Sequence, residues 1–114
     1  MALTFGSVDD LLAALRGQEL AADVDPSNLN LPGAWVTVDR IVAANVAGEW
    51  RLECSVYLVD ADRDHQRAME SLAAMFNLAT AVIRPDGAVQ PANVVMPGDP
   101  TPLPALRVPV YLYE

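Results

Sequence analysis

The sequence predicts an α+β fold: one domain with a mainly antiparallel sheet of about four strands, one long helix packed on the sheet and a short N-terminal helix. Two adjacent runs of alternating apolar and polar residues, 34–44 and 51–59, predict an antiparallel hairpin with one buried face. An apolar stripe of helical period follows at residues 62–81, and residues 106–113 alternate again. This order of elements indicates a sheet whose apolar face is covered by helices.

The hairpin strands have different side chains on their two faces. In the first run, strict alternation places Trp35, Thr37, Asp39 and Ile41 on one face and Val36, Val38, Arg40 and Val42 on the other. In the second run, the apolar face comprises Leu52, Cys54, Val56 and Leu58, and the opposite face comprises Arg51, Glu53, Ser55 and Tyr57. We therefore expect one face of this hairpin in the core and the other in solvent.

Both predicted helices carry start signals. Ser7 is the expected N-cap of the first helix and Gly17 its C-cap, with an apolar stripe formed by Val8, Leu11, Leu12 and Leu15. The acidic run Asp60, Asp62 and Asp64 complements the positive end of the second helix. The stripe of that helix comprises Ala61, His65, Ala68, Met69, Leu72, Met75, Phe76, Ala79 and Val82. We expect Met69, Leu72 and Phe76 to be buried against Val56, Leu58 or Val110.

Two stretches are predicted connections. Residues 17–33 form a long connection with no strand of its own, which either drapes over the domain or contacts a neighbouring subunit. In the proline-rich stretch 85–109, residues 94–96 predict a short strand. Pro109 lies in the last alternating run and marks an edge or a bulge, because proline donates no hydrogen bond to a sheet.

Composition excludes several classes of protein. The 114 residues, taken as one domain over 1–114, are 53% hydrophobic and carry a net charge of −8. All seven cations are arginines and they are scattered, so tight or sequence-specific binding to DNA is not expected. A single cysteine, Cys54, gives no disulfide framework. Neither a signal peptide nor a membrane span is apparent, and we expect a soluble protein made in the cytoplasm.

Candidate chemical sites are weak. The Asp60–Asp64 run resembles the start of a calcium loop, but His65 and Ser71 stand where such a loop needs glycine and its closing glutamate, which favours helix capping. Cys54 and His65 would form a nucleophilic dyad only if Cys54 left its apolar face, where a cysteine behaves as a small hydrophobic residue.

Other polar and aromatic residues also have ordinary explanations. Asp39, Glu49 and Glu53 are explained by a solvated sheet face, and Trp35 and Trp50 are either core residues or interface anchors. No phosphate loop, nucleophile motif or metal-ligand spacing is apparent. The sequence therefore predicts no catalytic, cofactor-binding or metal-binding residues, no cofactor and no enzyme activity.

The order of elements resembles a known family. The segments LPGAWVTVDRIV, RLECSVYLVDADRDHQRAMESLAAMFNLATAVI and LPALRVPVYLYE are similar in length and pattern to the tail terminator (tail-completion) proteins of long-tailed bacteriophages. The similarity extends over nearly the whole chain. It contains no diagnostic motif, so it assigns no role to an individual residue.

The resemblance implies a structural protein of the virion, located at the head-proximal end of the tail. Such a protein forms a ring, expected to be hexameric, that caps the tail tube, stops its polymerisation and provides the head-joining surface. Its implied partners are other copies of itself, the tail tube protein and the head–tail connector or stopper. DNA would pass through the lumen without specific binding, which suits a net negative subunit, and no membrane is involved.

Two alternatives remain open. A head–tail connector or stopper of the same virion would have similar size and charge. A small ligand-binding α+β domain, with a pocket between helix and sheet, belongs to a different class. The assembly state separates these classes, because a ring supports the first and a monomer with a bound metabolite supports the second.

Overall fold

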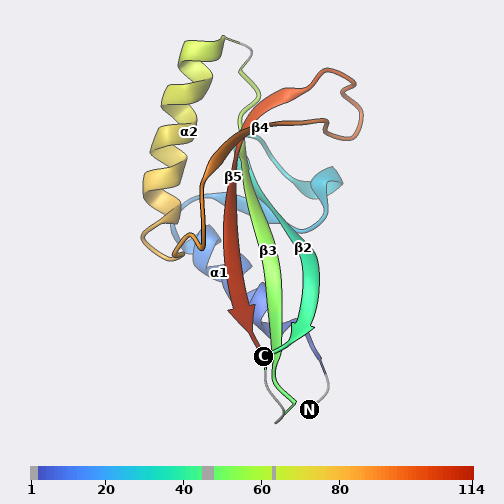
Figure 1. Ribbon diagram of the computed structural model, residues 1–114. Coiled ribbons are helices and arrows are strands. Elements are labelled where there is room, and N and C mark those ends of the chain that lie inside the picture. Colours follow the sequence, from blue (N-terminus) through green and yellow to red (C-terminus); the bar gives the residue numbers. More distant parts are fainter. Residues whose placement is uncertain (1–2, 45–47, 63) are drawn as a thin grey trace.

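Five strands form one mixed sheet in the order β1-β2-β3-β5-β4, flanked by two helices (Figure 1). The computed structural model describes residues 3–44, 48–62 and 64–114. The α+β class is confirmed, whereas the sheet has five strands rather than about four. The additional strand is β1 (Ala21–Asp23), which lies within the predicted connection and pairs in parallel with β2. Three residues are too few to show a period-two pattern, so the sequence could not reveal this strand.

The predicted hairpin is confirmed. β2 (Gly33–Ala43) and β3 (Trp50–Val59) pair in antiparallel orientation. β5 (Leu103–Tyr113) lies on the other side of β3, and β4 (Gln90–Val94) is the outer strand beyond it, beginning four residues before the predicted 94–96 strand. β4 pairs only as far as Arg107, so Pro109 lies where the outer edge of β5 has no strand beside it.

A β-bulge overturns part of the predicted facing of β2. Val38 pairs with Cys54 but Arg40 pairs with Glu53, which leaves Asp39 as an extra residue without a partner. Beyond Asp39 the alternation is reversed: Ile41 lies opposite the buried Leu52, while Arg40 lies on the same face as Glu53. Strict alternation had predicted the opposite placement, because a period-two pattern gives no sign of an inserted residue.

The first helix, α1 (Gly6–Gly17), is capped differently from the prediction. Its N-cap is Phe5, in a left-handed conformation with no side-chain cap bond. The carboxylate of Glu114 accepts instead from the Gly6 amide at 3.2 Å, the Ser7 hydroxyl at 2.9 Å and the Thr4 hydroxyl at 3.0 Å. Ser7 therefore donates to a distant residue rather than capping the helix.

The end of α1 also differs from the prediction. Gly17 is the last helical residue, and the left-handed position falls on Glu19, with φ of 62°. The Leu20 amide donates to the Leu15 carbonyl at 3.3 Å and the Glu19 amide to the Arg16 carbonyl at 3.1 Å, which is the Schellman pattern with glutamate in place of glycine. Leu15 and Leu20 are both buried in the core beside this turn.

The second helix, α2 (His65–Ala79), starts later than predicted. Asp64 is its N-cap and accepts from the Arg67 amide at 3.1 Å, as the capping interpretation predicts. Asp60 and Asp62 do not lie within the helix; they accept from the amides of Asp62 and Asp64, respectively. The acidic run thus supplies successive turns that lead the chain from β3 into the helix.

Both helices cover one face of the sheet. The helical side chains buried there are Val8, Leu11, Leu12 and Leu15 of α1 and Ala68, Leu72, Met75 and Ala79 of α2. They share a core with Val56, Leu58 and Val110, as expected for Leu72. Met69 and Phe76 pack against the same core but are only partly buried. His65 and Val82, assigned to the stripe from sequence, are exposed because α2 starts at the former and ends before the latter.

A second, smaller core lies at one end of the opposite face. It contains Val59, Val94, Met96, Leu103 and Ala105, and Leu29, Leu31, Trp35 and Tyr57 pack against it. The remainder of this face is not covered by a helix, and the domain is elongated, with extents of 49 × 28 × 24 Å (Figure 1). This uncovered area is not used by the packing of the domain itself.

Candidate interaction surface

The face of the sheet opposite the helices carries an unusual set of side chains, and we call it the open sheet face. Its members alternate with the core residues of β2, β3 and β5. They are Trp35, Thr37, Asp39, Arg40, Val42, Arg51, Glu53, Ser55, Tyr57, Arg107, Pro109, Tyr111 and Tyr113. All three tyrosines of the chain and three of its seven arginines lie here. Tyrosine, tryptophan and arginine are the residues most enriched at the centres of protein interfaces.

Glu53 holds two of these arginines. Arg40 donates to both carboxylate oxygens of Glu53, at 2.8 Å and 3.0 Å from Nη2, and Arg51 Nη2 donates at 3.0 Å. Partial burial by itself raises the pKa of Glu53, but the hydrogen bonds and charges of Arg40 and Arg51 outweigh it, so the pKa lies below its ordinary value. Glu53 therefore stays ionised and fixes the two guanidinium groups.

The guanidinium of Arg51 also lies over the ring of Tyr111, 5.1 Å from its centre. Arg40, in contrast, keeps 67% of its side chain exposed although it is bound to Glu53, whose side chain is only 15% exposed. The cluster thus presents one arginine rigidly and outward, a geometry suited to meeting a carboxylate on another molecule.

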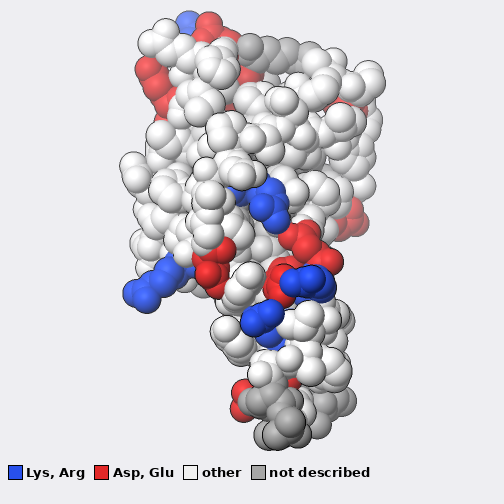
Figure 2. Space-filling view, viewed as in Figure 1, with Lys and Arg blue, Asp and Glu red and all other residues white. Residues whose placement is uncertain are grey.

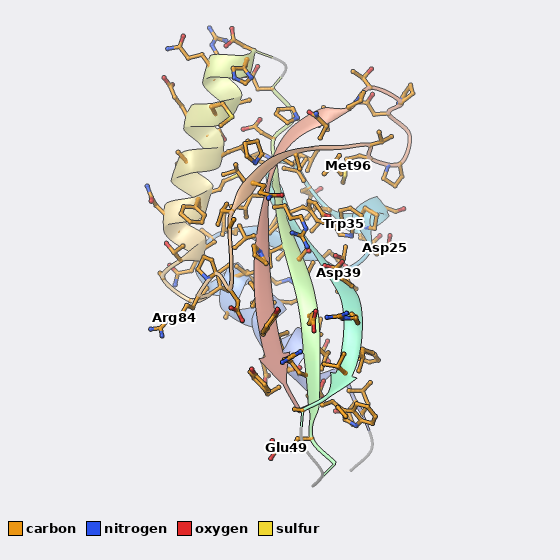
Figure 3. The ribbon with its side chains drawn as sticks, viewed as in Figure 1. Asp25, Trp35, Asp39, Glu49, Arg84 and Met96 are labelled. Atoms are coloured by element: carbon orange, nitrogen blue, oxygen red, sulfur yellow. The ribbon has the colours of Figure 1, made fainter. Side chains whose placement is uncertain are left out.

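Asp39 organises a second polar cluster beside the first (Figure 3). Thr37 donates to one of its oxygens at 3.0 Å, Ser55 donates to the other, and Arg107 Nη2 lies 3.5 Å from that second oxygen. The bulge makes this possible, because an unpaired residue can turn its carboxylate toward the neighbouring strand. Figure 2 shows the resulting mixture of basic and acidic side chains across this side of the molecule.

Aromatic rings border the polar clusters. Trp35 stacks on Tyr57 with ring centres 5.3 Å apart, and its indole nitrogen donates to the Val24 carbonyl at 3.1 Å. Trp35 is therefore an anchor of the small core, and Trp50 packs against the main core at the far end of the hairpin. Tyr113 is 61% exposed and Tyr111 is 36% exposed. These two rings lie at the uncovered end and are available for contact with another molecule.

The strand edges beside the open sheet face lack partners in the described part of the chain. β1 pairs only with residues 33–35 of β2, and β4 pairs only with residues 103–107 of β5. Residues 36–43 and 108–113 therefore have strand neighbours on one side only, although the Asp86 amide donates to the Pro109 carbonyl. Unpaired edges can accept a strand from another chain.

The structure separates the other candidate residues. Cys54 is buried in the main core, where desolvation and the charge of Asp39 raise its pKa to about 11, so the thiol is a poor nucleophile. His65 is exposed at the start of α2. The carboxylates of Asp60, Asp62 and Asp64 accept amides along their own chain, and within the described residues no group of three or more metal-ligating side chains is brought together.

A cavity of about 300 Å³ lies on the same side as the small core. Leu29 and Leu31 line it from one side and Met96, Asp99 and Leu103 from the other. This is not the pocket between helix and sheet that the ligand-binding alternative predicted. The space between helices and sheet is filled by fully buried side chains such as Leu15, Leu58 and Leu72.

Comparison with known proteins adds no relative: no protein-family model, curated protein or solved structure matches this chain. Among the described helices, none is both long enough and apolar enough to cross a membrane.

Sequence reasoning assigned the polar face of the hairpin to solvent and missed its organisation. The sign was available: Tyr57, Tyr111 and Tyr113 all fall on the polar side of an alternating run, where small hydrophilic residues would suffice. The contribution of Arg40 was not predictable, because it depends on the bulge at Asp39.

Proposed function

We propose that this protein is a structural, non-enzymatic subunit that assembles into a ring at the head-proximal end of a phage tail. The ring, expected to be hexameric, would cap the tail tube, stop its polymerisation and present the surface that joins the head. The observation that carries the assembly part of this proposal is the open sheet face. A face that gathers every tyrosine and three arginines, and that no helix covers, offers more adhesive surface than a monomer requires.

The phage part of the proposal rests on the resemblance of the sequence to tail terminator proteins. The α+β topology, with a hairpin feeding a long helix and a return to the sheet, is compatible with that role. The net charge of −8 suits a ring through which DNA slides without binding. Its partners would be other copies of itself, the tail tube protein and the connector or stopper.

Deletion of the gene from a phage that carries it tests this proposal. Electron microscopy of the lysate should reveal tail tubes of unregulated length and heads without tails. Tails of normal length that fail to join heads would assign the protein to the connector or stopper class instead. Normal infectious particles would refute a structural role.

One observation favours a second candidate function, that of a small ligand-binding domain. The cavity of about 300 Å³ beside Leu29 and Met96 is within the size range of small-molecule sites. Its lining residues are mostly apolar, and none of them is a buried charged side chain that would orient a ligand. A metabolite that co-purifies with a monomer, and is lost when Met96 is replaced by Trp, would support this alternative.

A further inference from the structure

The charge of this chain is distributed unevenly between two sides of the domain. The open sheet face carries three arginines and two carboxylates, a net charge of +1. Because the whole chain has a net charge of −8, the other residues together carry −9. Residues 6–20 contain three carboxylates and one arginine, a net charge of −2. We call this region the acidic α1 surface; its carboxylates, Asp9, Asp10 and Glu19, are all exposed.

The packing places these two surfaces apart. Val8, Leu11, Leu12 and Leu15 attach α1 to the face of the sheet opposite the open sheet face (Figure 1). Asp9 and Asp10 are exposed on the same helix. Arg40 and Arg107 belong to the other face. A contact that joins such surfaces cannot be self-complementary, so it must be head-to-tail.

This inference rests on the proposed ring: we infer that the open sheet face of one copy binds the acidic α1 surface of a second copy. Head-to-tail contacts close into a ring when each step adds a rotation, and they use different patches on each subunit. Arg40 and Arg107 face carboxylates across this contact, and Tyr111 and Tyr113 add apolar area beside them. A face-to-face dimer is disfavoured, because it would bring like-charged arginines together.

A reciprocal charge exchange tests this contact. The first variant, Arg40→Glu/Arg107→Glu, reverses the sheet face, and the second, Asp10→Arg/Glu19→Arg, reverses the acidic surface. None of these four residues is buried. A matched control, Gln66→Glu/Arg67→Glu/Ala73→Glu, makes the same change in net charge as the first variant at exposed positions of α2. Circular dichroism melts verify that every variant is folded.

Sedimentation velocity at low ionic strength, from micromolar to millimolar protein, gives the readout. Wild type and control should associate with rising concentration, and added salt should weaken the association. Each surface variant alone should associate at least about tenfold more weakly. An equimolar mixture of the two should recover wild-type association, because alternating copies then pair opposite charges at every contact.

Three results would overturn the inference: a wild type that stays monomeric at millimolar concentration, a control that weakens as much as the first variant, or a mixture that does not recover. A second variant that associates as strongly as wild type would indicate a face-to-face contact of two open sheet faces and would also overturn it. These outcomes leave the gene-deletion phenotype unaffected, so a wrong contact can be told from a wrong function. Conversely, a recovered mixture with a normal deletion phage would retain the contact and refute the tail role.

Discussion

Gly33 lies where the neighbouring backbone leaves no room for a Cβ atom. It begins β2 and pairs with Ala21 of the parallel strand β1. A Cβ atom at this position would lie 2.5 Å from the Asn30 carbonyl oxygen, 2.9 Å from Leu29 Cδ1 and 3.1 Å from the Ala21 carbonyl oxygen. Two of these three neighbours are backbone atoms, which cannot rotate away as a side chain can. Gly33→Ala therefore forces β1 or the 29–30 segment to move.

Overpacking of this kind costs about 1–3 kcal/mol. For a chain of this length the entropy of unfolding is about 240 cal/mol/K, so each kcal/mol lowers the melting temperature by about 4 °C. We expect Gly33→Ala to melt about 4–13 °C below the parent. The measurement is a thermal melt followed by circular dichroism or calorimetry.

Gly17→Ala is the matched control. It makes the same chemical change at the end of α1, where an added Cβ has no neighbour within 4 Å and φ is not positive. Alanine is the better helix former, so this variant should melt at the parent temperature or up to about 4 °C higher. If Gly33→Ala has the same melting temperature as Gly17→Ala, then β1 does not pack beside Gly33, and the parallel pairing is wrong.

Four further predictions concern stability and reactivity. Leu72→Ala should cost about 2–5 kcal/mol because Leu72 is fully buried, while Leu78→Ala on the exposed side of α2 should change stability by less than about 0.5 kcal/mol in a urea titration; equal costs would place the wrong face of α2 in the core. Glu19→Gly should stabilise by about 0.5–1 kcal/mol, since it relieves a left-handed backbone, and a loss would contradict the Schellman geometry. Burial alone raises the pKa of Glu114, but hydrogen bonds from Ser7, Thr4 and Gly6 lower it overall, so its stabilising effect is complete above about pH 4.5 and is lost as the pH falls toward the lowered pKa. The melting temperature of Glu114→Gln should consequently lie below that of the parent at pH 7 and approach it as the pH falls below 4.5 toward the lowered pKa; a difference that does not change with pH would contradict this prediction. The Cys54 thiol, buried and with a pKa of about 11, should react with a disulfide reagent at pH 8 only after unfolding, and rapid labelling of the native protein would contradict its burial.

The open sheet face connects the fold to the proposed assembly. The helices bury most of one side of the sheet, and the small core covers one end of the other side. What remains is a ribbon of β2, β3 and β5 whose arginines are already paired with Glu53 and Asp39, although the buried Arg51 Nε has no hydrogen-bond partner among the described residues. Side chains that are already held in such clusters lose little conformational entropy when a partner binds. This lowers the free-energy cost of association.

The sequence by itself determined the elements whose signal is local and repeated. Alternation over about ten residues located β2, β3 and β5, because each strand buries one face against a core that selects apolar residues at every second position. The spacing of Leu72, Met75 and Ala79 identified the buried stripe of α2 for the same reason at helical period. The sequence also predicted that the acidic run 60–64 caps this helix, but it placed the helix start at residue 62 and did not single out Asp64 as the cap.

Only the tertiary structure decided the features that depend on residues distant in sequence. β1 exists because residues 33–35 offer it an edge, and its three residues carry no pattern of their own. Glu114 replaces the expected Ser7 cap because the end of β5 lies beside the start of α1, more than one hundred residues away in the chain. The bulge at Asp39 moved Arg40 onto the polar face and so created its contact with Glu53. Periodicity records which side of an element is buried, but it contains no information about which elements meet, and the candidate interaction surface is made where they meet.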